Sequence, residues 1–385
     1  MFLQQKQSSA KRAISLDLAR GFMLLLIVLA HAPLYLYNSD PGVMSRPESV
    51  TFLDHLLNAL GELLIDNRAR PMFAVLFGYG MFMIFEKQVS RGNSEKEAIK
   101  TVTRRSLYLI LFGFILAVFI GGQDILMAYG IAGILVGRLL RRNNRLLIKV
   151  TLIITVVITF YLPFIWGSFL TEIGSYGFGS DFSANDSYIQ LLLDGLFYFP
   201  VIPVFIHFLF PVLPSVLIGI WAGRKRLLTE SKINHRNLKL IAAIGIAISI
   251  SGAVPLVMIN NVWEPGFFVA GIAYSVQIIT GIAGGLGYAA LFGFLSNIIK
   301  TPGTVTTSLT ALGKRSLTFF ILNETLLVIL LSPAALGLGG TLSNTGVIII
   351  ALFVWILSVV MASILEKFHI NGPLESFMRH LVYRK

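Results

Sequence analysis

Apolar segments long enough to cross a membrane recur along the whole chain. An α-helix needs about 20 residues to cross a hydrocarbon core of roughly 30 Å. Segments of this kind lie at approximately 20–37, 70–86, 106–122, 124–140, 146–166, 200–223, 238–259, 267–297, 315–333 and 345–365. The pattern therefore predicts an all-α membrane protein with about ten transmembrane helices.

The end of the chain has a different pattern. After Gly372 and Pro373, apolar residues recur at the spacing of one helical face, and basic residues occupy other positions. The apolar residues are Leu374, Phe377, Met378, Leu381 and Val382. We expect an amphipathic helix that lies on the inner leaflet as an anchor. The predicted domains are a single transmembrane domain over residues 1–365 and a cytoplasmic tail helix over residues 366–385.

The stretch between the fifth and sixth apolar segments is polar. Residues 167–187 are rich in Gly, Ser and Asp, which predicts a mobile external loop. Residues 188–199 then read as an interfacial helix. Four prolines interrupt the sixth segment, namely Pro200, Pro203, Pro211 and Pro214. Broken helices are tolerated in membranes where their backbone faces protein or a wet cavity, so we expect a break here.

The distribution of charge gives the expected orientation. Of 385 residues only 13% are charged and 55% are hydrophobic, with a mean hydropathy of +0.78, which excludes an ordinary soluble enzyme. Of the 31 Lys and Arg residues, 28 fall on one side of the predicted topology, and the other side has Arg46, Arg68 and Arg70. We therefore expect both termini in the cytoplasm. The net charge of +12 then reflects topology and contact with anionic inner-leaflet lipid, not a nucleic-acid partner.

The first apolar segment also mimics a secretory signal peptide. Lys11 and Arg12 precede an apolar run that ends in Ala30-His31-Ala32, a combination typical of a cleavage site. Pro33 would directly follow the cut, and Asp17 interrupts the approach to the apolar run. We expect this segment to be retained as the first transmembrane helix.

Several kinds of chemistry are disfavoured by the residues present. The chain has no cysteine, which excludes disulfides, a thiolate nucleophile and a cysteine-ligated metal. It has no paired histidines at ligand spacing, so we expect no bound metal. The eighth segment is rich in glycine, at Gly281, Gly284, Gly285 and Gly287. These glycines lie inside an apolar run, which favours close helix packing over a phosphate-binding loop.

Ionisable residues inside the apolar segments are the main functional signal, because a charge at the membrane centre costs about 2.5 kcal/mol or more. His31 follows Arg20 by eleven residues and so lies roughly 16 Å deeper along a helix. Glu324 follows Arg315 by nine residues and lies about 13 Å deep from the same face. Asp17 and Arg20 are three residues apart and are positioned to pair.

Two more polar residues lie toward the predicted outer side, and these are His207 and Asp124. Two interpretations remain open for them, as for His31 and Glu324. They either converge on an outward-leaning polar cavity or act as hydrogen-bonding residues that fix the packing of helices.

Ordered blocks along nearly the whole chain resemble the YeiB family of multi-pass bacterial membrane proteins. The blocks are Leu16-Asp17-Leu18-Ala19-Arg20-Gly21-Phe22, Leu76-Phe77-Gly78-Tyr79-Gly80, Arg104-Arg105, Asp124-Ile125-Leu126 with Tyr129, Gly313-Lys314-Arg315-Ser316-Leu317-Thr318, and Gly372-Pro373-Leu374-Glu375 with Arg379. The resemblance implies a multi-pass protein of the bacterial plasma membrane. The family is mainly described as of unknown role, with transport suggested.

The first segment also resembles that of membrane acyltransferases, which move acyl groups onto sugars and other exported acceptors. Those enzymes carry an Arg, ten intervening residues and a His, and Arg20 and His31 have this spacing. In YeiB-like sequences we would expect Asn in place of His31, and small polar residues or Gln near Asn323 and Glu324. Both departures bring this chain closer to acyl-transfer chemistry.

The resemblance assigns a role to each candidate. An imidazole such as His31 can deprotonate an acceptor hydroxyl or briefly carry an acyl group, and Glu324 can orient it. The basic residues expected to hold the phosphates of cytoplasmic acyl-coenzyme A are Arg20, Arg104 and Arg105. The residues expected to bind the other substrate, a sugar or lipid acceptor, are Asp124, His207, Asn323 and Arg70. Arg104 and Arg105 have an alternative role as topology determinants at a helix entry.

Two other functions fit the same pattern. Intramembrane His and Glu residues relay protons in transporters, and broken helices line transport sites, so proton-coupled transport of a small molecule is the main alternative. A structural or sensory membrane protein without turnover is the third.

Overall fold

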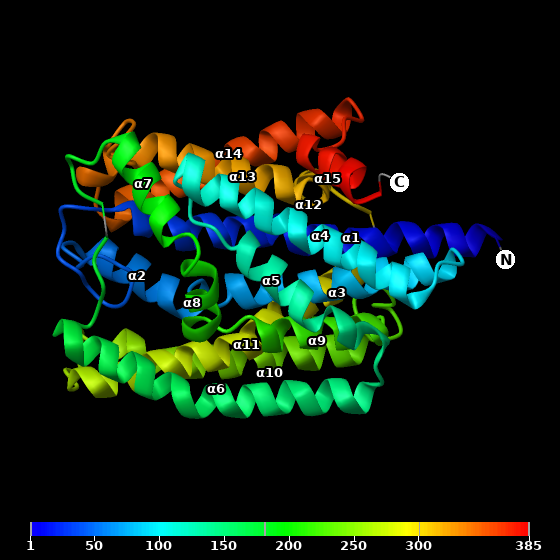
Figure 1. The fold of residues 1–385 in the computed structure, drawn as a ribbon, viewed down its shortest axis with the longest axis horizontal. Coiled ribbons are helices and arrows are strands. Elements are labelled where there is room, and N and C mark those ends of the chain that lie inside the picture. Colours follow the sequence, from blue (N-terminus) through cyan, green and yellow to red (C-terminus); the bar gives the residue numbers. More distant parts are fainter. Residues whose placement is uncertain (1, 181, 300, 384–385) are drawn as a thin grey trace.

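The computed structural model describes residues 2–180, 182–299 and 301–383, with side chains from residue 14 onward. Within these residues the chain is all-helical and no strand forms. Long helices run along the long axis of the molecule (Figure 1). They are α1 (Phe2–His31), α3 (Ala69–Ser90), α4 (Glu95–Phe114), α6 (Asn144–Ile173), α10 (His235–Met258), α11 (Phe267–Ile298) and α14 (Asn344–Lys367). The predicted all-α class is confirmed.

Shorter elements connect or interrupt these helices. They are η1 (Ala32–Tyr35), α2 (Phe52–Leu64), η2 (Ile115–Ile120), α5 (Leu126–Val136), η3 (Gly137–Arg141), α7 (Tyr188–Tyr198), α8 (Ile202–Leu209), α9 (Leu213–Arg224), α12 (Thr304–Lys314), α13 (Ser316–Leu331), η4 (Leu338–Gly340) and α15 (Pro373–Tyr383). The predicted interfacial helix over residues 188–199 corresponds to α7.

Fewer helices than predicted are long enough to cross a membrane by themselves. Among the described residues seven qualify by length and composition, or eight if α7 and α8, bent by 68° at their junction, form one span. The predicted segment 124–140 is α5 plus η3, and 200–223 is split into α8 and α9. The segment 315–333 is the 16-residue α13. Hydropathy locates an apolar run, but it does not show where prolines and turns divide it.

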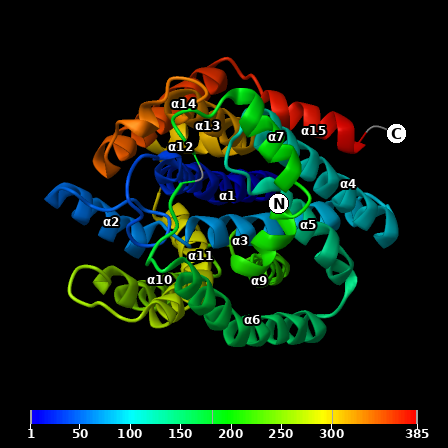
Figure 2. The same ribbon diagram turned by 60° about the vertical axis from the view of Figure 1, so that its left-hand side comes forward.

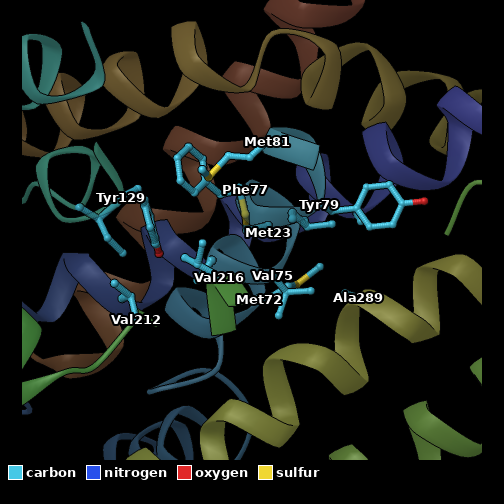
Figure 3. Packing of buried hydrophobic residues seen from close by; sticks show 14 of the residues in the cluster. Met23, Met72, Val75, Phe77, Tyr79, Met81, Tyr129, Val212, Val216 and Ala289 are labelled. Atoms are coloured by element: carbon cyan, nitrogen blue, oxygen red, sulfur yellow. The ribbon is translucent and has the colours of Figure 1, made fainter. Parts of the chain in front are cut away.

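Helices α1 and α3 occupy the middle of the bundle. In Figure 2, α13 and α14 lie on one side of them and α6 and α10 on the other. Buried Met72 and Val75 of α3 belong to one apolar cluster with Met23 of α1 and with Val216 of α9 (Figure 3). Gly78 lies so close to α9 that a Cβ there would clash with the backbone of Val216. This tight core fixes the outer end of α1 and the first turn of α3, where the candidate site lies.

Two breaks in the helices shape that site. Helix α1 ends at His31 and continues as the short 3₁₀-helix η1, which contains Pro33. Helix α4 continues as the π-helix η2 and stops at Gly121, whose φ of 78° favours glycine. The next residue, Gly122, has no room for a side chain, because a Cβ would come within 3.2 Å of Cβ of Glu324. The non-helical segment 121–125 can therefore pass directly beside α13.

The predicted mobile loop is instead tied to the rest of the molecule. Helix α6 extends to Ile173 and takes up the first part of this segment. The backbone N–H of Met44 donates to the carbonyl of Tyr176 at 3.0 Å, and that of Phe178 donates to the carbonyl of Met44 at 2.9 Å. The ring of Phe178 stacks on Trp166, with ring centroids 6.0 Å apart. The aromatic side chains supply contacts that the Gly- and Ser-rich composition does not reveal.

The predicted tail helix exists as α15, but its apolar side packs on the bundle. Met378 and Val382 are buried, with 7% and 4% of their surfaces exposed. Phe377 lies beside Phe112 of α4 with ring centroids 6.1 Å apart. The helix begins at the end where α1 begins (Figure 1). It therefore covers the end of the bundle, whereas the amphipathic pattern alone predicted a helix lying on the leaflet.

Candidate functional site

His31 and Glu324, which lie 293 positions apart in the sequence, are in direct contact. Nδ1 of His31 lies 2.7 Å from Oε1 of Glu324. Glu324 is fully buried in the middle of α13, while 14% of the His31 side chain remains accessible. The contact depends on α1 and α12 packing closely, because α12 leads directly into α13. A Cβ on Gly313 would clash with the backbone of Asp17, so this position requires glycine.

A chain of hydrogen bonds leads from Gln123 through Tyr35 to Glu324, which contacts His31. The backbone N–H of Gln123 donates to the hydroxyl oxygen of Tyr35 at 3.0 Å. The Tyr35 hydroxyl then donates to Oε2 of Glu324 at 3.4 Å. Glu324 thus accepts at one oxygen, and as a carboxylate it accepts at the other from Nδ1–H of His31. The remaining nitrogen, Nε2, carries the lone pair in the neutral imidazole.

Tyr35 and Gln123 were not predicted as site residues. The available signals were their positions, since Tyr35 follows His31 by four residues and Gln123 precedes Asp124. Helical spacing places residues four apart on one face, but the conversion to η1 could not be read from the sequence.

His31 lines a cavity of about 270 Å³ near the C-terminal end of α1, which the predicted topology assigns to the outer side. We call it the outer cavity. Its walls include parts of α1, α3, α8 and α11 and the segment 121–125. Phe178, from the loop that follows α6, lines one side. A second pocket of about 240 Å³ adjoins it toward the outer end of the bundle. The residues lining both are Leu34, Ser45, Gln123 and Phe178. The second pocket is thus a vestibule to the outer cavity.

Buried charges surround the outer cavity. Arg46 makes two hydrogen bonds to the Asp66 carboxylate, at 2.7 and 2.9 Å, with only 2% of its own surface exposed. Burial opposes the charge of Arg46, but the ion pair with Asp66 outweighs this effect and raises the pKa of Arg46. Arg68 donates to the backbone carbonyls of Glu62, Asp66 and Ser249. A signal for this network is present in the sequence, because only three basic residues lie on the otherwise acidic side of the predicted topology. They are Arg46, Arg68 and Arg70.

The other predicted substrate-binding residues have different surroundings. Arg70 lines the outer cavity, with its guanidinium 4.0 Å from the Phe210 ring centroid. Asp124 also lines it, but its carboxylate accepts from the backbone N–H groups of Leu126 and Met127, both at 2.9 Å, and so caps α5.

Two predicted substrate-binding residues do not line the outer cavity. His207 faces the backbone of Ala128 in α5 instead, and neither of its ring nitrogens makes a hydrogen bond of ordinary geometry within the described chain. Asn323 faces α14, where its side-chain oxygen accepts from Ser358.

A second cavity of about 270 Å³ lies at the opposite end of the bundle, under α15. We call it the inner cavity. Its basic residues come from four elements and are Arg20, Arg105, Lys314 and Arg379. Arg20 pairs with Asp17 at 3.3 Å, as predicted. Arg104 is exposed and does not line the cavity, so the structure separates it from Arg20 and Arg105. Leu126 lines the inner cavity and Ile125 lines the outer one, so the two meet at the start of α5.

The tail helix closes the inner cavity through one carboxylate. Oε1 of Glu375 accepts from the backbone N–H groups of Leu317 and Thr318, at 2.7 and 3.2 Å. Oε2 accepts from the Thr318 hydroxyl at 2.6 Å. Glu375 thus caps the first turn of α13, the helix that carries Glu324. Two sequence blocks that resemble the YeiB family, around residues 313–318 and 372–375, are therefore in contact.

Comparison with known proteins agrees with this resemblance. Residues 222–385 match the family model described as "Protein of unknown function (DUF418)". The YeiB-like resemblance is confirmed. The chain is also 26% identical over 276 residues to the "Uncharacterized protein YxaH" of Bacillus subtilis (strain 168). That alignment covers 62% of this chain and 64% of the relative, so the chain spans less than two thirds of the relative's length. Neither description names an activity.

The matched segment contains only part of the site. It includes Glu324 and Glu375, whereas His31, Tyr35 and Gln123 lie before it. Among the described residues, no group of three or more His, Asp or Glu side chains is arranged to hold a metal ion. The site consists of an imidazole–carboxylate pair at the wall of the outer cavity.

Proposed function

We propose that this multi-pass membrane protein transfers an acyl group from cytoplasmic acyl-coenzyme A to a hydroxyl of an exported or outer-leaflet acceptor, such as a sugar or lipid. The observation that carries the proposal is the 2.7 Å contact between His31 and Glu324 at the wall of the outer cavity. Nε2 of His31 forms no hydrogen bond with a described residue and is available to a substrate.

The proposed reaction is general-base catalysis. Nε2 of His31 removes the proton of the acceptor hydroxyl while that oxygen attacks the thioester carbonyl carbon. The new C–O bond replaces the C–S bond, and the leaving coenzyme A thiolate takes up the proton from the imidazolium. Glu324 stabilises the imidazolium, and Tyr35 holds Glu324 in place. The products are an ester and free coenzyme A, and no other reactant is needed.

The inner cavity is the proposed donor site. Coenzyme A carries several phosphates, and guanidinium groups bind phosphate through paired hydrogen bonds. Arg20 and Arg105 are close enough for their charges to repel each other, and a bound phosphate between them would relieve that repulsion. The cavity is also lined by Phe73, Leu76 and Phe77, which suit an acyl chain. The predicted role of Arg104 as a donor contact is not part of the proposal.

The orientation of the protein follows from its charges. The basic loops lie at the end of the bundle where α1 begins and α15 covers the inner cavity, and the positive-inside rule assigns such an end to the cytoplasm. We therefore propose a plasma-membrane protein with cytoplasmic termini and inner-leaflet anionic lipid around that end. The vestibule then opens toward the outside, where the acceptor enters.

The test uses purified protein in lipid vesicles, with acetyl-coenzyme A as donor and glucose, glycerate and glycerol 1-phosphate as trial hydroxyl acceptors. Release of free thiol is measured. His31→Ala should reduce turnover at least a hundredfold, the scale of general-base catalysis, and Glu324→Gln should reduce it less. His207→Ala is the matched control, because it removes another buried imidazole that does not line the outer cavity.

Three results would contradict the proposal. One is equal loss of turnover in the His31 and His207 variants. Another is a His31 variant whose loss of activity follows from a lower melting temperature. The third is wild-type protein that consumes no thioester but carries a proton-driven solute flux that His31→Ala abolishes, which would establish the transporter.

A further inference from the structure

Arg70 is a half-buried cation with few partners. It lies in the first turn of α3 and lines the outer cavity together with His31. Its guanidinium stacks on Phe210, with 4.0 Å to the ring centroid. Within the described residues it forms no hydrogen bond or ion pair, although a guanidinium has five N–H donors. A cation–π contact satisfies none of these donors, so they are available to a ligand in the cavity.

The carboxylates near Arg70 interact with other groups. Both oxygens of Asp66 are engaged by Arg46, and both oxygens of Asp124 by the start of α5. Glu324 pairs with His31 and Tyr35. Glu62 lies near the guanidinium groups of Arg46 and Arg68. Asp66 is close enough to attract Arg70, but none of these carboxylates forms a hydrogen bond or an ion pair with its guanidinium.

We propose that Arg70 binds an anionic group, a carboxylate or a phosphate, carried by the acceptor in the outer cavity. A guanidinium in a water-poor cavity is stabilised most by an anion that accepts two parallel hydrogen bonds. A neutral hydroxyl compensates no charge. Phe210 holds the guanidinium carbon 4.0 Å from its ring centroid, and the N–H donors of the guanidinium remain for the ligand.

This inference rests on the proposed function because it takes the ligand of the outer cavity to be the acceptor. Binding of an anion to Arg70 can be measured without the reaction. It narrows the acceptor class to hydroxyl compounds that also carry an acidic group. Arg70 would hold the acidic group while the hydroxyl faces Nε2 of His31. Arg70 is then a specificity residue, and the reacting atoms belong to His31 and the two substrates.

The experiment measures binding of three related probes to purified protein in detergent by isothermal titration calorimetry. The probes are glycerol 1-phosphate, glycerate and glycerol. We expect the phosphate or the carboxylate probe to bind at least tenfold more tightly than glycerol. Arg70→Gln should remove this preference, and Arg70→Lys should keep part of it, because lysine retains the charge without the fork. Arg104→Gln is the control and should leave binding unchanged, because Arg104 is exposed and lines neither cavity.

The comparison of the two anions identifies the preferred group. Any one of four outcomes overturns the proposal: no anion binding at 10 mM, roughly the weak limit of such ligands; equal binding of glycerol; unchanged binding in Arg70→Gln; or an equal loss of binding in Arg104→Gln. If Arg70→Gln does not fold, Arg70→Lys decides, and unchanged affinity in that variant overturns the proposal.

Failure of the two proposals can be told apart. Thioester consumption without Arg70-dependent anion binding supports acyl transfer and overturns the anionic acceptor. Arg70-dependent anion binding without thioester consumption supports the anion site and overturns acyl transfer.

Discussion

The two cavities have similar volumes, but their polar groups are held in different ways. In the outer cavity His31, Glu324, Tyr35 and Gln123 form one chain of hydrogen bonds. In the inner cavity the basic residues come from separate elements, and Arg105 has a buried nitrogen with no hydrogen-bond partner. Fixed geometry suits a reacting centre, whereas several cations around an apolar space suit retention of a charged ligand.

Removal of the carboxylate that caps α13 is the largest expected effect on stability. Glu375→Ala leaves the first turn of α13 without its cap and loosens the cover of the inner cavity. The loss should be about 1.5–3 kcal/mol, the range for hydrogen bonds to a charged group. Thermal unfolding in detergent measures it, with exposed Ser376→Ala as the control. Equal melting temperatures would mean that the cap adds no stability and that the inner end is held by apolar contacts alone.

Loss of one inner cation should affect binding of the donor and not the chemical step. Arg105→Gln is expected to raise KM for acetyl-coenzyme A about tenfold, with kcat unchanged, because one charge-assisted contact is lost. Added salt should shrink the difference. Arg104→Gln is the control, because Arg104 is the neighbouring residue and its side chain is exposed. A fall in kcat for Arg105→Gln would contradict the assignment of donor binding to the inner cavity and of the chemical step to the outer cavity.

The smallest expected effect concerns the end of the outer hydrogen-bond chain. Tyr35→Phe removes the hydroxyl between Gln123 and Glu324 but keeps the ring that packs near Phe182. We expect kcat to fall only about threefold, with donor KM unchanged, because the hydrogen bond from Tyr35 to Glu324 is long at 3.4 Å and therefore weak. Tyr37→Phe is the control, because its hydroxyl bonds to the carbonyl of Gly337. An unchanged kcat would show that Glu324 needs no support from Tyr35.

The sequence predicted the parts of the molecule that depend on composition and spacing. Apolar length located the helical segments, and the cost of burying charge singled out His31 and Glu324. Glu324 was predicted as the orienting partner of His31, but the geometry of their contact was not, because it depends on α12 ending at Lys314 and on α13 starting two residues later beside α1. The role of Gln123 was also hidden, since it acts through its backbone N–H, which every non-proline residue has.

Other differences arise from packing between distant segments. The pattern of α15 predicted an apolar face correctly, but the same face can lie on lipid or on protein. The contact between α15 and α4 shows that part of this face packs on protein. This position of α15 also places Arg379 at the inner cavity. Arg104 and Arg105 were equivalent in the sequence. Adjacent residues of a helix point about 100° apart, so only one of them can face the cavity.

The meeting of the two cavities at Ile125 and Leu126 has an electrical consequence. Both side chains are buried, with 4% and 1% of their surfaces exposed. If water fills the cavities from opposite sides, most of the membrane potential falls across this short apolar partition. A charge that crosses the full potential gains about 2.3 kcal/mol per 100 mV. The partition then works as an insulator, and a polar residue at position 126 would let ions leak through a protein that otherwise keeps the membrane sealed.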